Sequence, residues 1–429
     1  MNLQSTRRLE CGADLVVEHV PAAQSVALVW FLPIGTALFP DDADGHAAML
    51  TELIFRGAGG LSSRELSDTM DRLGLQRSAG AHAHHLRVDA TLLADRLDDA
   101  LPLLVNLIRR PALPDEAVDP VRNLCLQSID SLNDEPQHLV MLLVRGRHLP
   151  WPFNRHGYGD PAVIQAADGD GLRRAWTERC APEGAIIAAA GAVDGNDLAS
   201  RLDHLLAEWA GAAPADPESR PSSRGYLHVH QETAQVHIGL AYDAPAEPHE
   251  DAMLERLATS VLSGSTSGRL FSEVRQKRSL CYSVGASYRA GRDRGLVNVY
   301  AGTTPERAQE TLDVCLAELD RLSQGATREE YERAKVGLKS RLVMRGESTP
   351  ARAGAIGGDW FRLRRLRSLD DIAKEIDAVS FDDLNAYLAR RRFDAQTVVT
   401  VGSAPLSVPD GLAVEHRDIA EVLSPAAAS

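Results

Sequence analysis

Apolar residues form short strand-like runs followed by longer stretches with helical periodicity, and this order occurs twice along the chain. Runs of four to eight apolar residues bounded by polar turns predict strands. Three runs in each half have this length, at 15–18, 25–32, 185–190, 226–229, 234–241 and 397–401. The last run of each half leads into a turn that contains glycine.

Long amphipathic stretches predict helices at corresponding places in the two halves. They lie at 95–110 and 306–322, the second with Thr304 as cap and Pro305 at the first helical position. Because the order of elements repeats at an offset of roughly 210 residues, an internal duplication is indicated. Strands interleaved with helices in this way predict an α+β fold of two lobes, each an antiparallel-rich sheet with helices packed on one face.

The midpoint of the chain has the composition of a linker. Residues 211–225 read GAAPADPESRPSSRG and are rich in Pro, Ala, Ser and Gly. We therefore expect an N-terminal lobe at 1–210, a linker at 211–225 and a C-terminal lobe at 226–429.

Composition and charge exclude some classes of protein. The 429 residues include 44% hydrophobic and 25% charged side chains, as in an average soluble globular protein. The formal net charge of −14 argues against a nucleic-acid partner, because phosphate binding requires a basic surface.

Five scattered cysteines without a C-x-x-C pair indicate reduced thiols. The longest apolar run, at 26–32, is too short to cross a bilayer, and residues 1–16 lack the apolar stretch of a signal peptide. The expected location is the cytoplasm, with no membrane partner.

The segment LSGSTSGRLFSEVRQKRSLCYSVGASY, at 262–288, carries the most specific motif. Gly268–Phe271, Arg275 and Leu280–Val284 fall on the S-R-L-F-x-x-x-R and G-L-x-Y-S-V pattern of the M16 (pitrilysin/insulinase, mitochondrial processing peptidase-like) family, which the chain resembles. The resemblance implies that Arg275 and Tyr282 hold the backbone of a peptide and support its polarised carbonyl group. An arginine fork and a phenolic hydroxyl suit that role.

The same two residues also have ordinary structural explanations. Arg275 would lie on the solvated face of a basic helix end, and Tyr282 would be a half-buried strand residue alternating with Val284 and Ala286. Spacing alone favours these explanations, whereas the match over the whole segment favours the functional one. The turn at 264–268 has Thr266 where a nucleophile elbow requires Ser, so it is interpreted as a turn leading into a helix.

The stretch GHAAMLTELIFRG, at 45–57, resembles the zinc-binding helix of the same family, G-L-x-H-x-x-E-H-x-x-F-x-G. The three chemical positions then fall on Ala48, Thr51 and Glu52, and the downstream glutamate ligand falls on Ser128. A zinc hydrolase needs two imidazoles four residues apart and a carboxylate base. All three ligand positions are altered, so no zinc is expected in this chain.

A different metal site remains an open alternative. His82, His84 and His85 cluster in a strand-like stretch, and His46 precedes the altered helix. His82 and His84 would share one sheet face and could add to Glu52. The simpler explanation is a strand whose histidines are exposed or hydrogen-bonded.

The resemblance implies two tandem M16-type (LuxS/metallohydrolase-like) lobes over nearly the whole chain. In family members built from separate chains, one subunit supplies the zinc site and the other supplies the Arg/Tyr pair. The expected function is therefore a zinc-free subunit that binds a peptide substrate together with an M16 homologue carrying H-x-x-E-H, whose zinc completes the peptidase. The alternatives are a purely structural M16-like scaffold, against which Arg275 and Tyr282 speak, and a self-sufficient hydrolase that uses His82 and His84.

Overall fold

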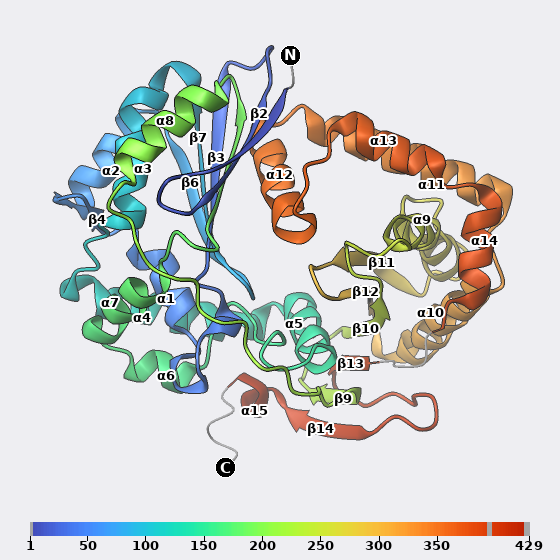
Figure 1. Cartoon of the computed structure of the whole chain (residues 1–429). Coiled ribbons are helices and arrows are strands. Elements are labelled where there is room, and N and C mark those ends of the chain that lie inside the picture. Colours follow the sequence, from blue (N-terminus) through green and yellow to red (C-terminus); the bar gives the residue numbers. More distant parts are fainter. Residues whose placement is uncertain (1–2, 393–396, 424–429) are drawn as a thin grey trace. The chain divides into compact units, whose positions relative to one another are not determined.

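The computed structural model describes residues 3–392 and 397–423 (Figure 1). The chain forms two compact units, and each unit combines three separate segments. Unit 1 contains the chain up to Asp130, Trp151–Arg220 and Arg345–Leu366, and unit 2 contains Ser131–Pro150, Pro221–Met344 and the chain from Arg367 on.

Unit 1 is built on a six-stranded sheet in the order β1-β2-β8-β3-β7-β6. β2 and β8 run parallel, and the other neighbouring strands are antiparallel. The strands are β1 (Gln4–Arg8), β2 (Asp14–His19), β3 (Ser25–Leu32), β6 (Gln76–Ala81), β7 (Leu86–Leu93) and β8 (Ile186–Gly191). A separate two-stranded ribbon pairs β4 (Gly57–Ala58) with β5 (Leu61–Ser62).

Unit 2 has a second six-stranded sheet, in the order β11-β12-β10-β13-β9-β14. β9 runs parallel to both β13 and β14, and the remaining pairs are antiparallel. The strands are β9 (Gly225–His230), β10 (Val236–Ala244), β11 (Cys281–Ala290), β12 (Gly295–Thr303), β13 (Thr397–Gly402) and β14 (Val414–Asp418).

The two sheets share the arrangement of five strands, as a duplication predicts. β2-β8-β3-β7-β6 in unit 1 corresponds in order and direction to β9-β13-β10-β12-β11 in unit 2. The sixth strand differs, because β1 precedes β2 and pairs with it antiparallel, whereas β14 comes from the end of the chain and pairs in parallel. The predicted α+β class and the paired lobes are therefore confirmed.

Most helices pack on one face of each sheet and enclose a large apolar core. In unit 1 they are α1 (His46–Leu53), α2 (Ser63–Arg72), α3 (Leu97–Arg109), α4 (Asp115–Asp130), α6 (Pro161–Ala166), α7 (Gly169–Arg179) and α8 (Gly195–Leu205). In unit 2 they are α9 (Ala252–Ser263), η5 (Phe271–Gln276), α10 (Ala308–Ser323), α11 (Arg328–Gly346), α13 (Leu369–Ala378) and α14 (Phe381–Arg390). α15 (Ile419–Leu423) packs against a separate apolar cluster on the other face of this sheet. The shorter 3₁₀ turns are η1 (Thr36–Leu38), η2 (Asp41–Ala43), η3 (Ala94–Arg96), η4 (Ser131–Asp134) and η6 (Pro305–Arg307).

Two helices are exchanged between the halves of the sequence (Figure 1). α5 (Pro136–His148), from the first half, packs on β10 and β13 of unit 2, where Val140 and Val144 join a buried apolar cluster. α12 (Thr349–Leu363), from the second half, packs on β2, β3 and β8 of unit 1, where Ala353 and Ile356 do the same. The expected lobes at 1–210 and 226–429 therefore differ from the compact units by these two segments, although the chain does pass from unit 1 to unit 2 within 211–225.

Polar contacts also hold α12 on the sheet of unit 1. The Arg352 guanidinium forms a buried ion pair with Glu18, with Nε 2.7 Å from Oε1. Trp360 Nε1 donates to Asp14 Oδ2 at 2.9 Å, and Arg364 Nη1 reaches the same oxygen at 2.9 Å. Both carboxylates belong to β2, so the helix is fixed along this strand as well as across the sheet.

Gly357 sets how closely α12 approaches the sheet. A Cβ atom at this position would lie 2.3 Å from Cε2 of Phe31 and 2.9 Å from Cβ of Ala188. We expect Gly357→Ala to lower the free energy of unfolding of unit 1 by about 1–3 kcal/mol, because the core there cannot make room. Urea unfolding followed by tryptophan fluorescence measures the change.

Gly354 on the same helix is the matched control. Its added Cβ would lie 2.8 Å from Nη2 of Arg87, the end of a flexible side chain. Gly354→Ala is therefore expected to raise the free energy of unfolding slightly, by no more than about 1 kcal/mol, because alanine is favoured over glycine within a helix. Equal effects of the two substitutions would contradict the close packing assigned to Gly357.

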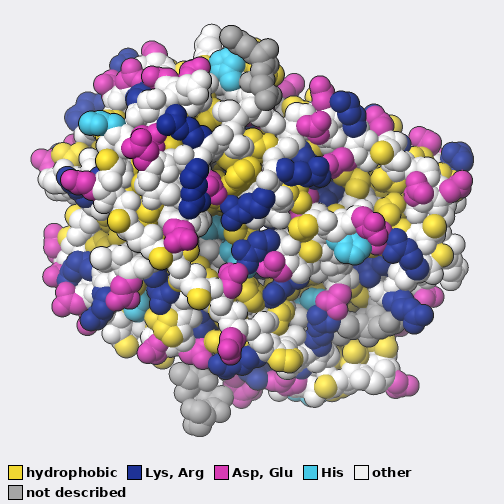
Figure 2. All heavy atoms as spheres, viewed as in Figure 1, with side chains coloured by type: hydrophobic (Ala, Val, Ile, Leu, Met, Phe, Trp, Pro, Cys, Tyr) yellow, Lys and Arg dark blue, Asp and Glu magenta, His cyan; other side chains and the backbone are white. Residues whose placement is uncertain are grey.

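The chain has free thiols and a surface of mixed charge (Figure 2). Among the described residues, no helix has the length and apolar character needed to cross a membrane. All five cysteines are free thiols. Lys and Arg side chains are interspersed with Asp and Glu over the face shown in Figure 2.

Candidate functional site

Arg275 lies in η5, which is a π-helix. The backbone NH of Lys277 donates to the Ser272 carbonyl oxygen at 2.9 Å, five residues earlier, as the wider helix requires. Such single π turns are often found at functional sites, because they shift the side chains out of the regular helical register. The guanidinium of Arg275 is exposed and stacks over the ring of Phe271, with 5.1 Å between Cζ and the ring centroid.

The basic neighbours of Arg275 are paired with a single buried carboxylate. Lys277 Nζ donates to Glu273 Oε1 at 2.7 Å, and Arg278 Nη1 donates to Glu273 Oε2 at 2.8 Å. The hydrogen bonds from Lys277 and then Arg278 hold the pKa of Glu273 below its usual value. Arg275 itself makes no ion pair or hydrogen bond to any described side chain. Arg275 therefore differs from Lys277 and Arg278, because its charge has no carboxylate partner among the described residues. This difference is not expected if Arg275 is only one of several basic residues at a solvated helix end.

Tyr282 sits at an irregularity near the start of β11, the edge strand of the sheet in unit 2. The register of β11 on β12 shifts between Cys281 and Ser283, so Tyr282 occupies a bulge. Val284 and Ala286 pack against the core, whereas the side chain of Tyr282 is 62% exposed. A bulge redirects a side chain in this way, and the half-buried position expected from strand alternation is wrong for Tyr282.

Arg275 and Tyr282 lie at the same end of β11. The connecting turn is fixed by Ser279, whose φ of 52° is unusual for a non-glycine residue, and by Arg307, whose Nη1 donates to the Ser279 carbonyl oxygen at 2.6 Å. Burial raises the pKa of the Cys281 thiol to about 11, and the charge of Arg275 acts against that rise. Arg275 thus lies within electrostatic range of the residue next to Tyr282.

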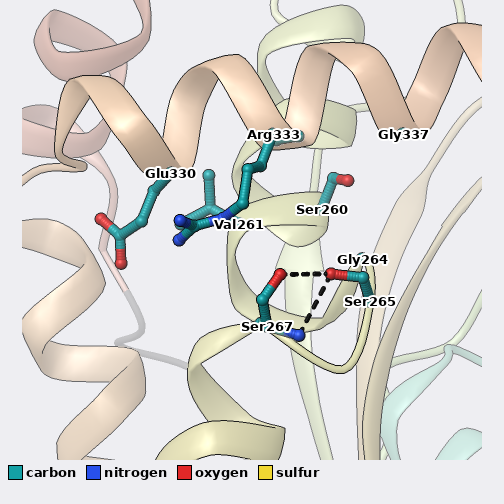
Figure 3. Close-up of a pocket in the computed structure, with 10 residues that line it drawn as sticks. Ser260, Val261, Gly264, Ser265, Ser267, Glu330, Arg333 and Gly337 are labelled. Carbon is teal, nitrogen blue, oxygen red and sulfur yellow. Dashed lines mark hydrogen bonds between the residues drawn. The ribbon is translucent and has the colours of Figure 1, made fainter.

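The Gly/Ser-rich turn that leads into this segment is shown in Figure 3. Ser265 and Ser267 hydrogen-bond through their hydroxyl groups at 2.8 Å, and the backbone NH of Ser267 donates to Ser265 Oγ at 3.2 Å. The turn lines a cavity of about 30 Å³ beside α11, which has room for a water molecule. The interpretation as a turn leading into a helix is confirmed, because it joins α9 to the helical segment that begins at Arg269.

α1 of unit 1 corresponds to the zinc-binding helix of the family, but the residues at the ligand positions differ from those of the family pattern. α1 packs against α4, so the residues at 48, 51 and 52 and the residue at 128 are on neighbouring helices. Ala48 offers no donor atom, and the Thr51 hydroxyl donates to the Ala48 carbonyl oxygen at 2.7 Å. The Ser128 hydroxyl donates to the Leu124 carbonyl oxygen at 2.8 Å. These residues do not fit a zinc ion.

Glu52 is the one acidic residue left in this set. Its charge acts on Cys125 of α4, whose pKa is raised to about 11 by burial and then by Glu52. Among the described residues, no three His, Cys, Asp or Glu side chains are grouped so that they could hold a metal ion.

The histidines at 82–85 occupy the turn between β6 and β7, so the strand expected there is wrong for them. The backbone carbonyl oxygen of His82 accepts from Thr36 at 2.9 Å, which ties the turn to the loop after β3. His84 contacts the ring of Phe361 with 5.4 Å between centroids, and the ring of His85 contacts that of Phe361 at 5.2 Å. Burial, followed by the nearby charges of His82 and His84, holds the pKa of His85 well below its usual value. The cluster is packed among aromatic rings.

Two features that shape the site were not predicted from the sequence. They are the π-helix η5 and the bulge at Tyr282. Both belong to the backbone path from α9 to the edge strand β11, which the pattern of side chains does not specify. The ion pair of Glu273 with Lys277 could have been predicted from the sequence. Glu273 stands four residues before Lys277, which is the spacing at which opposite charges pair on a helix.

The chain matches two family models. Residues 15–148 match "Insulinase (Peptidase family M16)", and residues 168–338 match "Peptidase M16 inactive domain". Among curated proteins, it is 25% identical to an uncharacterized zinc protease of Bacillus subtilis, over 94% of this chain and 99% of the relative. It is 28% identical to an uncharacterized zinc protease of Streptomyces coelicolor, over 87% of this chain and 84% of the relative.

Solved structures show the same fold. A crystal structure described as a peptidase M16 inactive domain from Pseudomonas fluorescens superposes with a TM-score of 0.84 at 20% identity, covering 95% of this chain and 99% of that one. The structure of a protease from Helicobacter pylori gives a TM-score of 0.84 at 19% identity, with 94% and 99% covered. Both are similar in fold over nearly their whole length.

Proposed function

The chain belongs to the M16 peptidase family, and we propose that it is the zinc-free subunit of a two-chain M16 peptidase, in which Arg275 and Tyr282 hold the peptide substrate. The partner is an M16 homologue that carries H-x-x-E-H and binds the zinc. The complex acts in the cytoplasm, where the five free thiols stay reduced.

The contrast between two sets of residues carries this proposal. The side chains of Arg275 and Tyr282 are exposed and hydrogen-bond to no described residue, although forming a π-helix and a bulge at their positions gives up regular backbone hydrogen bonding. Ala48 and Ser128 stand at ligand positions without a group that binds zinc, and Thr51 stands at the position of the carboxylate base. The hydroxyl groups of Thr51 and Ser128 donate to carbonyl oxygens of their own helices. A chain that keeps the substrate-holding residues without the metal ligands fits one half of a divided active site.

The chemistry expected of this half is positioning and charge stabilisation. The planar guanidinium of Arg275 offers several N–H donors to peptide carbonyl oxygens, and the Tyr282 hydroxyl offers one more. Donors fixed in place before the reaction stabilise the negative charge that develops on the carbonyl oxygen of the scissile bond. The partner's zinc supplies the activated water.

Reconstitution tests the proposal. The purified chain, a homologue with H-x-x-E-H from the same genome and their mixture are each incubated with a library of internally quenched peptides. We expect turnover only in the mixture, together with a complex of both chains in size-exclusion chromatography. Turnover by this chain alone would favour a self-sufficient hydrolase, and a stable complex without turnover would favour a structural scaffold.

A further inference from the structure

Asn298 is a buried amide without hydrogen-bond partners. It lies on β12 and is 2% exposed, and neither its Nδ2 nor its Oδ1 contacts a hydrogen-bonding group of the described chain. Buried side-chain amides are normally satisfied, so an amide with both ends free needs an explanation. A ligand that completes its hydrogen bonds provides one.

Two unpaired arginines belong to the same region of unit 2. Arg145 of α5 makes no ion pair within the described chain, and its Nε is buried without a partner. Burial lowers the pKa of Arg145, and the charge of Arg289 on β11 lowers it further, so the two guanidinium groups lie within electrostatic range of each other. Arg289 is exposed and has no ion pair with a described residue either. Two such cations without a counter-charge repel each other and attract an anion.

The register of the sheet places these groups on one face. Ser287 of β11 stands opposite Asn298, and Arg289 stands opposite Leu296, in the antiparallel pair of β11 and β12. Leu296 packs in the apolar cluster under α5, so this face is the one that carries α5 and Arg145. Arg289 and Asn298 therefore lie on the face of the sheet that α5 covers, and Arg145 belongs to that helix.

Two carboxylates that contact α5 are already paired with basic side chains. Asp243, which stands opposite Leu296 on β10, accepts hydrogen bonds from Arg224 at 2.5 and 2.6 Å, and its Oδ1 lies 3.2 Å from Nε2 of His148. Glu415 is held by Arg147, the other arginine near the end of α5, at 2.5 Å. Neither carboxylate pairs with Arg145 or Arg289.

We propose that Arg145, Arg289 and Asn298 form a carboxylate-binding site for the peptide substrate, an inference that rests on the proposed function. Guanidinium forks pair with the two oxygens of a carboxylate, and the Asn298 amide adds an N–H donor. The carboxylate is either the C-terminus of the peptide or an Asp or Glu side chain.

The spacing along β11 defines how such a peptide would lie. Tyr282 and Arg289 are seven residues apart on the edge strand, which is roughly 23 Å in extended conformation at about 3.3 Å per residue. An extended peptide held at Tyr282 reaches the site with a carboxylate about seven residues from the bond to be cleaved. The site thus selects substrates by the position of a negative charge.

Peptide binding to the full-length chain tests this inference. Four fluorescein-labelled peptides of one uncharged sequence are compared by anisotropy: one with a free C-terminal carboxylate, one with a C-terminal amide, and two amidated forms with an internal Glu or Gln. We expect the free-carboxylate peptide, the Glu peptide or both to bind about tenfold more tightly than the matched uncharged peptide. The arm that shows the preference identifies the source of the carboxylate.

Variants assign the preference to the site. Arg289→Gln, at an exposed position, is expected to abolish the preference for a carboxylate, whereas Arg328→Gln, an exposed arginine on α11, is expected to keep it. Asn298→Leu removes the unsatisfied amide, so it should raise the thermal midpoint of the chain while it weakens binding of the charged peptide. A purely structural asparagine would give a lower midpoint.

The outcomes separate this inference from the proposed function. Equal binding of charged and uncharged peptides, with all of them weakened by Arg275→Gln, would overturn the carboxylate site and leave the proposed function standing. A preference that persists in Arg289→Gln would overturn the site as well. Absence of binding by every peptide would contradict both.

Discussion

Replacing Arg275 by Gln is expected to lower the kcat/KM of the two-chain complex for peptides by about 100-fold or more, with a comparable loss for Tyr282→Phe. Each substitution removes a donor from the carbonyl oxygen on which charge develops while leaving the exposed surface of unit 2 otherwise unchanged. Steady-state cleavage of an internally quenched peptide by the reconstituted complex measures the effect.

Lys277 provides the matched control for this experiment. It is also exposed and lies two residues after Arg275, but its charge is taken up by Glu273. Lys277→Gln should leave turnover within about twofold of the wild type, since Arg278 continues to neutralise the carboxylate and exposed ion pairs contribute little. Undiminished turnover in both Arg275→Gln and Tyr282→Phe would remove the substrate-holding role and favour the scaffold.

A chain that ends at Arg220 is expected to fail to fold, although it contains every strand of the sheet in unit 1. It lacks α12, which covers the second face of that sheet. The sheet residues left bare are Val16, Ala27, Val29, Phe31, Ile186, Ala188 and Ala190. Each buried Val, Ile or Phe is worth about 1.5–3 kcal/mol, so the loss is comparable with the roughly 5–15 kcal/mol of net stability of a domain.

Co-expression provides the control for the truncation. Supplying the segment 345–366 in trans, fused to a soluble carrier, should restore soluble protein with a cooperative thermal transition, because Arg352 and Trp360 can again reach Glu18 and Asp14. Soluble, cooperatively folding 1–220 without the added segment would show that the unit does not depend on α12.

The periodicity of the sequence was sufficient for six of the strands and for the duplication. The apolar runs at 25–32 and 397–401 lie within β3 and β13, and both sheets use the predicted elements in the same order. Periodicity shows which side of a helix is apolar. It does not show which of the two sheets that side packs against, because this depends on tertiary contacts. For this reason the exchange of α5 and α12 could not be predicted.

The sequence predicted which residues form the candidate site, but it did not predict the backbone geometry that presents them. The match of the whole segment 262–288 drew attention to Arg275 and Tyr282. Their positions in a π-helix and a bulge, however, are features of the folded backbone that the match did not predict. His82 and His84 were expected in a strand-like stretch, whereas the chain reverses there to form the β6–β7 turn. Asn298 and Arg145 carry no sequence signal, because what marks them is the lack of a partner in space.

The metal content of the purified chain tests the central claim most directly. The chain and the partner that carries H-x-x-E-H are expressed separately with added zinc, desalted and analysed for zinc per polypeptide by mass spectrometry. We expect about one zinc per partner chain and no stoichiometric zinc in this chain, because Ala48 and Ser128 provide no ligand and leave Glu52 alone among the three ligand positions. One zinc per molecule of this chain, retained after desalting, would contradict the assignment of the metal to the partner.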